Sequence, residues 1–348
     1  MNILITGNMG YIGSELVKDI RQKYTLSKII GYDIGYFKDS LTNTITFPEK
    51  YVDVQYSGDI RKFDKNILSD IDSIVHLAAI SNDPIGNSYG SVTTDVNYLS
   101  TIDLAKKASQ MGVKNFVFAS SCSIYGNGTT ESRNEKCETN PLTAYSKSKI
   151  NAEEELKKLA DKNFCVSSLR FATACGMSDR LRFDLVLNDF VASAHTKRKI
   201  EILSDGTPWR PLINVSDMCR AIDWALNRKK ELDEPYIMAN VGKNENNIQI
   251  KDLAFLVKDI FREIEVEINH EAQPDKRSYK VNFDFFSSFA GKYLPIKSLS
   301  ETVDELKKNL IQMSFKDKNF RKSNLIRLNN LSNLRNQNKL NSNLEWIN

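Results

Sequence analysis

A tyrosine and a lysine, Tyr145 and Lys149, stand four residues apart in the sequence. On a helix this spacing places both side chains on one face, one turn apart. A phenol has a pKa near ~10 and is a poor base at neutral pH, but an adjacent ammonium favours the phenolate and lowers that pKa. The pair therefore indicates a proton shuttle, if something nearby needs one. Without context it is a half-buried tyrosine beside a solvated lysine, a spacing that also arises by chance.

A glycine-rich turn near the N-terminus supplies that context. Gly7, Gly10 and Gly13 follow a short apolar segment and open an amphipathic stretch, and Asp33 ends the next apolar segment. Such a turn lets the backbone approach a pyrophosphate at a helix N-terminus, and the acid hydrogen-bonds the adenosine ribose. The acid would repel a ribose phosphate, so NAD is favoured over NADP. The alternative is a plain tight turn with a loop acid. The residues of the turn expected to bind the cofactor are Gly7, Met9, Gly10, Tyr11, Ile12 and Gly13.

The elements that position these residues alternate along the first half of the chain. This rhythm predicts an α/β fold, a Rossmann-type doubly wound parallel sheet that binds ligands at the carboxyl ends of its strands. One strand ends at Ser121, so Ser121, Tyr145 and Lys149 are expected to converge there, with Ser121 holding a substrate hydroxyl for hydride transfer. The predicted strands are 3–6, 28–33, 51–56, 73–79, 115–120 and 166–171, and the predicted helices 11–24, 92–111 and 145–160.

Composition limits the class of protein. The 348 residues carry 48 basic and 44 acidic side chains, too balanced for a nucleic-acid-binding protein. No apolar run approaches the ~18 residues of a membrane span. The first strand starts at residue 2, so no signal peptide is expected, and the five irregularly spaced cysteines predict reduced thiols in the cytoplasm. His76, His195 and His270 lack partners at metal-ligand spacing, so no metal is expected; His76 ends a strand and is interpreted as structural, and the other two as surface residues.

At these residues the chain resembles the extended short-chain dehydrogenase/reductases that act on nucleotide sugars. The resemblance covers about residues 1–315. It implies that Asp59 and Ile60 flank the adenine, that Leu77, Ala78 and Ala79 line the dinucleotide, and that Lys149 holds the nicotinamide ribose. The motifs are Gly7-x-x-Gly10-x-x-Gly13, Gly58-Asp59-Ile60, His76-Leu77-Ala78-Ala79, Asn97, Ser120-Ser121, Tyr125-Gly126, Tyr145-x-x-x-Lys149 and Trp209-Arg210-Pro211.

The resemblance also implies a domain organisation: an NAD-binding domain (1–172) and an interleaved nucleotide-sugar-binding lobe (173–315). The remaining residues (316–348) are predicted from their own pattern to form a helical tail packed on the body. Helices are predicted at 183–196 and 217–228, a strand at 200–203, and a loop at 172–182 across the nicotinamide end. Leucines recur every third residue from Leu325 to Leu334. A homodimer through the helices 92–111 and 145–160 is expected.

Two arginines, Arg210 and Arg277, match family residues that grip the substrate diphosphate, a task suited to bidentate guanidinium groups. Asn188 matches a residue of the phosphate-binding helix. The alternative for each arginine is a surface charge, and for Arg180 and Arg182 the two interpretations are evenly balanced. Ser121, Cys122 and Ser123 complete the predicted substrate contacts.

The residues after Ser121 bear on the reaction. The resembling 4,6-dehydratases carry an Asp-Glu pair there, and decarboxylating members a Glu at the second position, whereas this chain has Cys122 and Ser123. Hydride chemistry at a sugar-ring carbon, most often C4, is therefore expected. A 4-epimerase is favoured, with a dehydrogenase or 4-ketoreductase as the alternative. Cys122 also admits a 3- or 5-epimerase with a cysteine acid/base, although a buried cysteine is more often a small apolar filler.

Two other classes of function remain. A non-enzymatic NAD sensor with this fold would typically lack Tyr145 or Lys149, and both are present. A reductase of a small carbonyl compound would not need Arg210 and Arg277. The favoured prediction is an enzyme of surface polysaccharide or glycoside assembly, with the nucleotide base, the sugar and the stereocentre left open.

Overall fold

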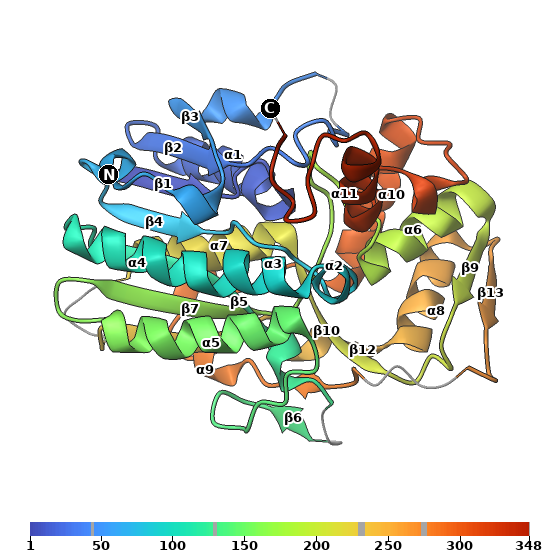
Figure 1. Cartoon of the computed structure of the whole chain (residues 1–348). Coiled ribbons are helices and arrows are strands. Elements are labelled where there is room, and N and C mark those ends of the chain that lie inside the picture. Colours follow the sequence, from blue (N-terminus) through green and yellow to red (C-terminus); the bar gives the residue numbers. More distant parts are fainter. Residues whose placement is uncertain (43–44, 128–130, 229–233, 273–276, 348) are drawn as a thin grey trace.

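A central sheet of seven parallel strands organises the molecule (Figure 1). The computed structural model describes residues 1–42, 45–127, 131–228, 234–272 and 277–347. The predicted α/β Rossmann-type fold is confirmed. In order across the sheet the strands are β3 (Val54–Ser57), β2 (Lys28–Asp33), β1 (Asn2–Thr6), β4 (Ser73–His76), β5 (Asn115–Ser121), β7 (Cys165–Phe171) and β11 (Tyr236–Val241).

Helices cover both faces of this sheet, and the alternation along β1 explains why. Ile3 and Ile5 face one core, whereas Leu4 faces the other, because successive strand residues point to opposite faces. Helices α1 (Tyr11–Lys23) and α7 (Val215–Leu226) pack on the first face. Helices α4 (Ser100–Gln110) and α5 (Ala144–Leu159) pack on the second (Figure 1).

The predicted helix at 92–111 is divided. It consists of α3 (Gly90–Thr94), a π-helical turn at Asp95–Leu99, and α4. In that turn the Asn97 amide accepts from the Ile80 backbone N–H at 2.7 Å and donates to its carbonyl at 2.9 Å. The wide turn therefore ties the helix to the loop after β4, and such turns are frequent at functional sites.

The second half of the chain builds a smaller lobe and also returns to the central sheet, because β11 pairs with β7. Helices α6, α8 and α10 share an apolar core in which Leu187, Val257 and Leu306 are fully buried. The elements of this half are β8 (Thr173–Cys175), α6 (Val186–Lys197), β9 (Lys199–Ile202), β10 (Trp209–Asn214), β12 (Asn247–Gln249), α8 (Ile250–Phe261), β13 (Glu265–Ile268) and α10 (Leu299–Gln312). The short elements are α2 (Asp83–Ser88), β6 (Ser132–Arg133), β14 (Lys280–Val281), α9 (Asp284–Ser287) and α11 (Arg327–Asn336).

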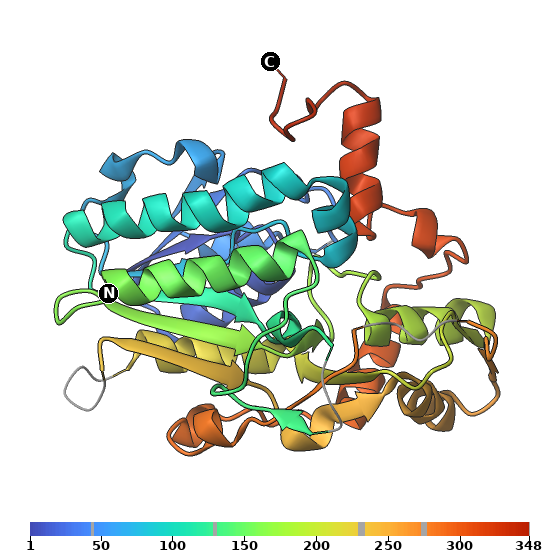
Figure 2. The ribbon, with the colours of Figure 1, turned by 60° about the horizontal axis from the view of Figure 1, so that its bottom comes forward.

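The C-terminal segment joins the two parts of the molecule. Phe320 lies in the core of the smaller lobe, whereas Leu331, Leu340 and Leu344 lie in the core on one face of the central sheet. Figures 1 and 2 show the segment leaving the smaller lobe through α11 and turning back toward β2 and β3. Across the described ranges no helix combines the length and apolar character needed to cross a bilayer.

Candidate active site and cofactor cleft

The turn after β1 is built from backbone alone. Gly7 has a φ of +75°, and a Cβ there would lie 2.6 Å from the backbone nitrogen of Ala78. A Cβ at Gly13 would lie 2.3 Å from the carbonyl oxygen of Gly7. No side chain caps α1 at Gly10, so the first N–H groups of this helix are available to an anion.

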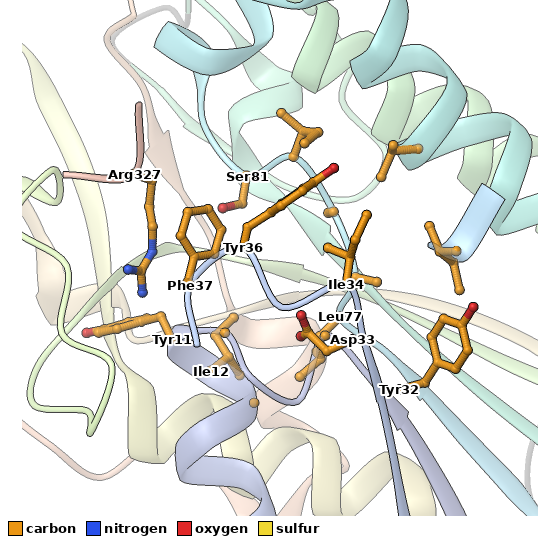
Figure 3. A pocket seen from close by; sticks show the side chains of 18 of the residues that line it. Tyr11, Ile12, Tyr32, Asp33, Ile34, Tyr36, Phe37, Leu77, Ser81 and Arg327 are labelled. Atoms are coloured by element: carbon orange, nitrogen blue, oxygen red, sulfur yellow. The ribbon is translucent and has the colours of Figure 1, made fainter. Parts of the chain in front are cut away.

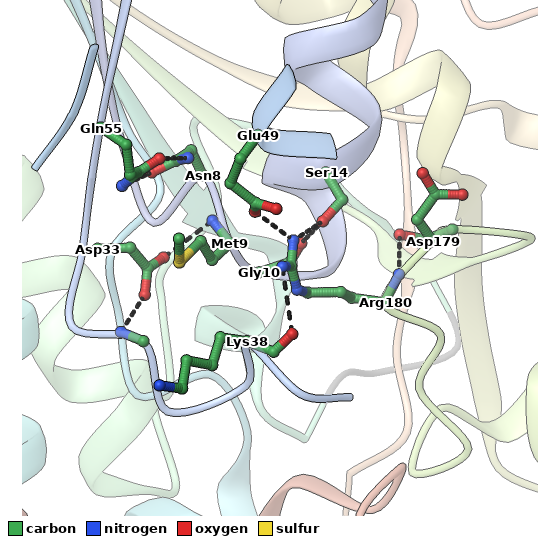
Figure 4. A network of polar contacts seen from close by, with 12 residues as sticks. Asn8, Met9, Gly10, Ser14, Asp33, Lys38, Glu49, Gln55, Asp179 and Arg180 are labelled. Carbon is green, nitrogen blue, oxygen red and sulfur yellow. Dashed lines mark hydrogen bonds and ion pairs between the residues drawn. The ribbon is translucent and has the colours of Figure 1, made fainter. Parts of the chain in front are cut away.

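Asp33 lies at the end of β2, beside this turn (Figure 4). One carboxylate oxygen accepts from the Met9 backbone N–H at 3.0 Å, and the other from that of Gly35 at 2.7 Å. Burial raises the pKa of Asp33, and these two hydrogen bonds oppose the shift. The strand end and the turn thus hold an acid where the sequence predicts the ribose contact.

A cavity of about 140 Å³ runs over these residues (Figure 3). Met9 does not line it and takes part only through its N–H bond to Asp33. The cradle without side chains and the acid at its edge fit the dinucleotide expected from the sequence. The predicted residues that line the cavity are Gly7, Gly10, Tyr11, Ile12, Gly13, Asp33, Asp59, Ile60, Leu77, Ala78 and Ala79.

The lining residues that were missed in the sequence include Tyr36 and Phe37 from the loop after β2, and Arg327 from α11. Tyr36 and Phe37 follow the strand end that carries Asp33, and this position is the one signal that could have found them. Arg327 carries no motif, since its place depends on a contact across most of the chain.

A larger cavity, of about 850 Å³, continues from the first. Ser121, Tyr145 and Lys149 line it, so the structure brings the predicted catalytic residues together. The residues common to both cavities are Ile12, Leu77, Ala79, Ser81, Ala174 and Arg182. Tyr145 and Lys149 therefore face the region that adjoins the cofactor cleft.

Helix α5 positions Tyr145 and Lys149 near its N-terminus. A capping box between Thr143 and Ser146 starts the helix directly before them. The Lys149 ammonium donates to the Ala119 carbonyl at 2.7 Å and lies 4.7 Å from the centre of the Phe118 ring. Burial lowers the pKa of Lys149 to about 7, while Glu153 opposes this shift.

The expected lowering of the Tyr145 pKa by Lys149 is not found. Burial raises the pKa of Tyr145 to about 12, a hydrogen bond with Ser121 opposes the shift, and the Asp83 carboxylate adds to it. The Lys149 ammonium lies 5.7 Å from the centre of the Tyr145 ring but donates to the Ala119 carbonyl, and burial of the phenol dominates the shift. Tyr145 in this structure is therefore a protonated acid, paired with Ser121.

The side chains of Ser121, Cys122 and Ser123, at and just after the end of β5, point in two directions. Ser121 donates to the Ser123 hydroxyl at 2.9 Å, and both line the larger cavity. Cys122 is fully buried, its thiol lies 3.0 Å from the Arg170 carbonyl, and burial raises its pKa. The expected substrate contact by Cys122 is therefore not found, because its side chain points into the core and away from the cavity.

The arginines singled out in the sequence do not all line a cavity. Arg210 and Arg277 line the larger cavity as expected, and Arg277 pairs with Asp83 at 2.7 Å. Arg182 lines both cavities and pairs with Asp184 at 2.9 Å. Arg180 lines neither cavity.

Arg180 instead braces the start of α1. Its guanidinium donates to the Ser14 hydroxyl at 3.0 Å and pairs with Glu49 at 2.7 Å (Figure 4). A direct substrate contact by Arg180 is therefore not found.

Asn188 is also structural. It is fully buried, accepts from the Gly176 N–H and donates to the Arg182 carbonyl, each at 2.9 Å. It does not line the cavity but fixes the loop that carries Arg182. Arg321 of the C-terminal segment lines the cavity instead and was not anticipated.

His76 bonds the Thr6 and Thr101 hydroxyls at 2.7 and 2.9 Å, and burial lowers its pKa to about 3. It is a neutral structural residue under the cofactor cleft. Within the described residues, no group of three or more His, Cys, Asp or Glu side chains could hold a metal ion.

The NAD dependent epimerase/dehydratase family model matches residues 3–242, and the chain belongs to this family of enzymes. The resemblance inferred from the motifs and the NAD cofactor are thereby confirmed. A dTDP-D-glucose 4,6-dehydratase of Dictyostelium discoideum is 28% identical over 69% of this chain, which spans 58% of that relative. A putative UDP-glucose 4-epimerase of Methanocaldococcus jannaschii is 27% identical over 74% of this chain and 81% of its own length.

Solved structures share the fold. A UDP-glucuronic acid 4-epimerase from Bacillus cereus, in complex with UDP-glucuronic acid and NAD, superposes with a TM-score of 0.74 at 23% identity. The match covers 90% of this chain and 100% of that chain. The relatives thus include both epimerases and dehydratases, so the family alone leaves the reaction open.

Proposed function

We propose that this enzyme is a 4-epimerase of a nucleotide-diphosphate sugar. The cavity beside the cofactor cleft is lined by Ser121, Tyr145 and Lys149 and by the arginines Arg210 and Arg277. Arginines bind diphosphates well because a planar guanidinium pairs with two oxygens at once. The B. cereus epimerase with the same fold, solved in complex with UDP-glucuronic acid and NAD, supports a substrate of this class.

The residues have separate tasks in this proposal. Ser121 holds the sugar hydroxyl that Tyr145 deprotonates and later reprotonates, and Lys149 anchors the cofactor ribose. NAD, held by the glycine turn and Asp33, would supply the hydride acceptor and donor for the reaction. Because burial raises the pKa of Tyr145 to about 12 in this structure, the phenol must first lose its own proton before it can accept one from the substrate, and a neighbouring positive charge would favour that loss.

The observation that carries the proposal is the state of the acids around the cavity. Asp83, Asp184, Asp189 and Glu201 line it, and each forms an ion pair with an arginine. Although burial opposes it, Arg182 lowers the pKa of Asp184. Acids held in this way exchange protons poorly, and Cys122 and Ser123 offer no carboxylate, so elimination of water lacks its acid–base pair.

The test is a screen of nucleotide sugars in D₂O, with the product identified by NMR and mass spectrometry. A 4-epimerase gives the C4 epimer without net NADH and with no deuterium at carbon, since the hydride returns within the site. Stoichiometric NADH would identify a dehydrogenase, and a product lighter by one water a dehydratase. Deuterium at C3 or C5 would identify a 3- or 5-epimerase; each of these results contradicts the proposal.

A further inference from the structure

The C-terminal segment brings a buried cation into the cofactor cleft. Arg327 is the first residue of α11, and its side chain is 1% exposed. It lines the smaller cavity and not the larger one. Figure 3 shows it beside Phe37, pointing toward Tyr11, far from the Tyr32 end. Tyr11 is the first residue of α1, so Arg327 faces the N-terminus of that helix.

Arg327 is incompletely paired. One guanidinium nitrogen, Nη2, donates to the Arg180 carbonyl at 2.8 Å, and the guanidinium carbon lies 4.4 Å from the centre of the Phe37 ring. The other terminal nitrogen, Nη1, is buried without a hydrogen-bond partner, and no ion pair joins Arg327 to a carboxylate of the described chain. A buried cation of this kind is unfavourable unless an anion compensates it.

The neighbouring arginines do not compete for such an anion. Arg180 pairs with Glu49 at 2.7 Å and Arg182 with Asp184 at 2.9 Å. Burial lowers the pKa of Arg327 to about 9, and repulsion from Arg182 adds to this shift. Arg327 still carries its charge at neutral pH, in a place that favours an anion.

We propose that Arg327 binds the pyrophosphate of NAD, opposite the first N–H groups of α1. The helix N-terminus supplies donors from one side of the cavity and Arg327 from the other. The cofactor site then includes a segment that lies beyond the residues matched by the family model, which end at 242.

The same segment also holds the loop at the adenosine side. Asn330 donates to the Tyr36 carbonyl at 2.6 Å, and the Trp346 indole to the Ile34 carbonyl at 2.7 Å. Arg61 donates to the Asn343 carbonyl at 2.8 Å.

The test compares ADP, adenosine and UDP by calorimetry, with the full chain and the variants Arg327→Gln and Arg327→Lys. Arg335→Gln, on the same helix, is the matched control, because Arg335 contacts Tyr89 outside the cavity. Arg327→Gln should weaken ADP binding about ten- to a hundredfold, as expected for a charge-assisted contact. Adenosine and UDP should change less than about twofold, and Arg327→Lys should recover part of the ADP affinity.

The proposal is overturned if Arg327→Gln weakens ADP and adenosine equally, if it weakens UDP instead, or if ADP binding is unchanged. A second measurement does not depend on whether any variant folds. In the unmodified protein, ADP should slow hydrogen–deuterium exchange in residues 327–336 more than adenosine does. Equal protection by the two ligands would also overturn the proposal.

Discussion

The two cavities are walled in different ways. The cofactor cleft includes a turn of bare backbone, at Gly7 and Gly13, where an added Cβ would collide with neighbouring main chain. The substrate cavity is lined by long charged side chains, such as Arg210 and Arg277, from distant segments. A backbone wall tolerates no added atom, whereas an arginine wall can be altered one contact at a time. A substitution in the glycine turn should therefore abolish cofactor binding, whereas substitution of a single arginine should only weaken substrate binding.

The largest effect is expected where the two cavities adjoin. Tyr145→Phe removes the proton-transferring hydroxyl, so kcat should fall by about 10²- to 10⁴-fold. NAD binding, measured by calorimetry, should be unchanged. Tyr56→Phe, on the exposed strand β3, should leave kcat unaltered. Turnover above a tenth of the original in Tyr145→Phe would contradict the assigned role.

A methyl group tests the backbone wall. Gly13→Ala places a Cβ 2.3 Å from the Gly7 carbonyl oxygen, so the turn must shift. We expect a loss of about 1–3 kcal/mol in the free energy of unfolding and loss of measurable NAD binding. The control is Gly90→Ala at the start of α3, where the nearest atom is 4.0 Å away. Urea unfolding and calorimetry of both variants measure the difference; equal behaviour would contradict the comparison.

Acid should destabilise the fold at His76, which lies beneath the cofactor cleft. The folded pKa of His76 is lowered to about 3, so between pH 6.5 and 3 the unfolded chain binds a proton that the folded chain does not. The free energy of unfolding therefore decreases as the pH is lowered through this window, by about 1.4 kcal/mol per pH unit, which amounts to about 2 kcal/mol at pH 5. His76→Gln should lack this slope in urea titrations from pH 7 to 5. The same slope in both proteins would exclude His76 as its source.

The smallest effect is expected at the arginine wall. Arg277→Gln removes one of the proposed diphosphate contacts, so KM for the nucleotide sugar should rise about tenfold, with little change in NAD affinity. Arg198→Gln, at an exposed ion pair with Glu263, is the control. A loss of NAD affinity in Arg277→Gln would show that the two walls are not independent.

The difference between the walls also explains what could be predicted from the sequence. The turn from Gly7 to Gly13 and Asp33 are spaced by local backbone geometry, which the chain order records. The direction of Cys122 is not recorded there, because the chain enters a tight turn after Ser121 and swings that side chain into the core. The strands along the first half of the chain followed from periodicity, and the pairing of Tyr145 with Lys149 followed from their spacing.

Contacts across the whole chain leave no such trace. Arg327 reaches Phe37 only after the C-terminal segment has crossed from one part of the molecule to the other. Arg321 in the substrate cavity has the same origin. The spacing of Tyr145 and Lys149 predicted a lowered pKa for the phenol. It does not record that the Lys149 ammonium donates to the Ala119 carbonyl.

The return of the chain to the central sheet has a consequence for protein production. Strand β7 is buried at every residue and receives its outer neighbour, β11, only after residue 235. A fragment ending near residue 172 would present β7 as an edge whose unpaired backbone groups are open to pairing with other chains. During synthesis the ribosome must likewise deliver residue 241 before this edge is covered. Expression of the nucleotide-binding half alone should therefore yield inclusion bodies, and a useful fragment must extend past β11.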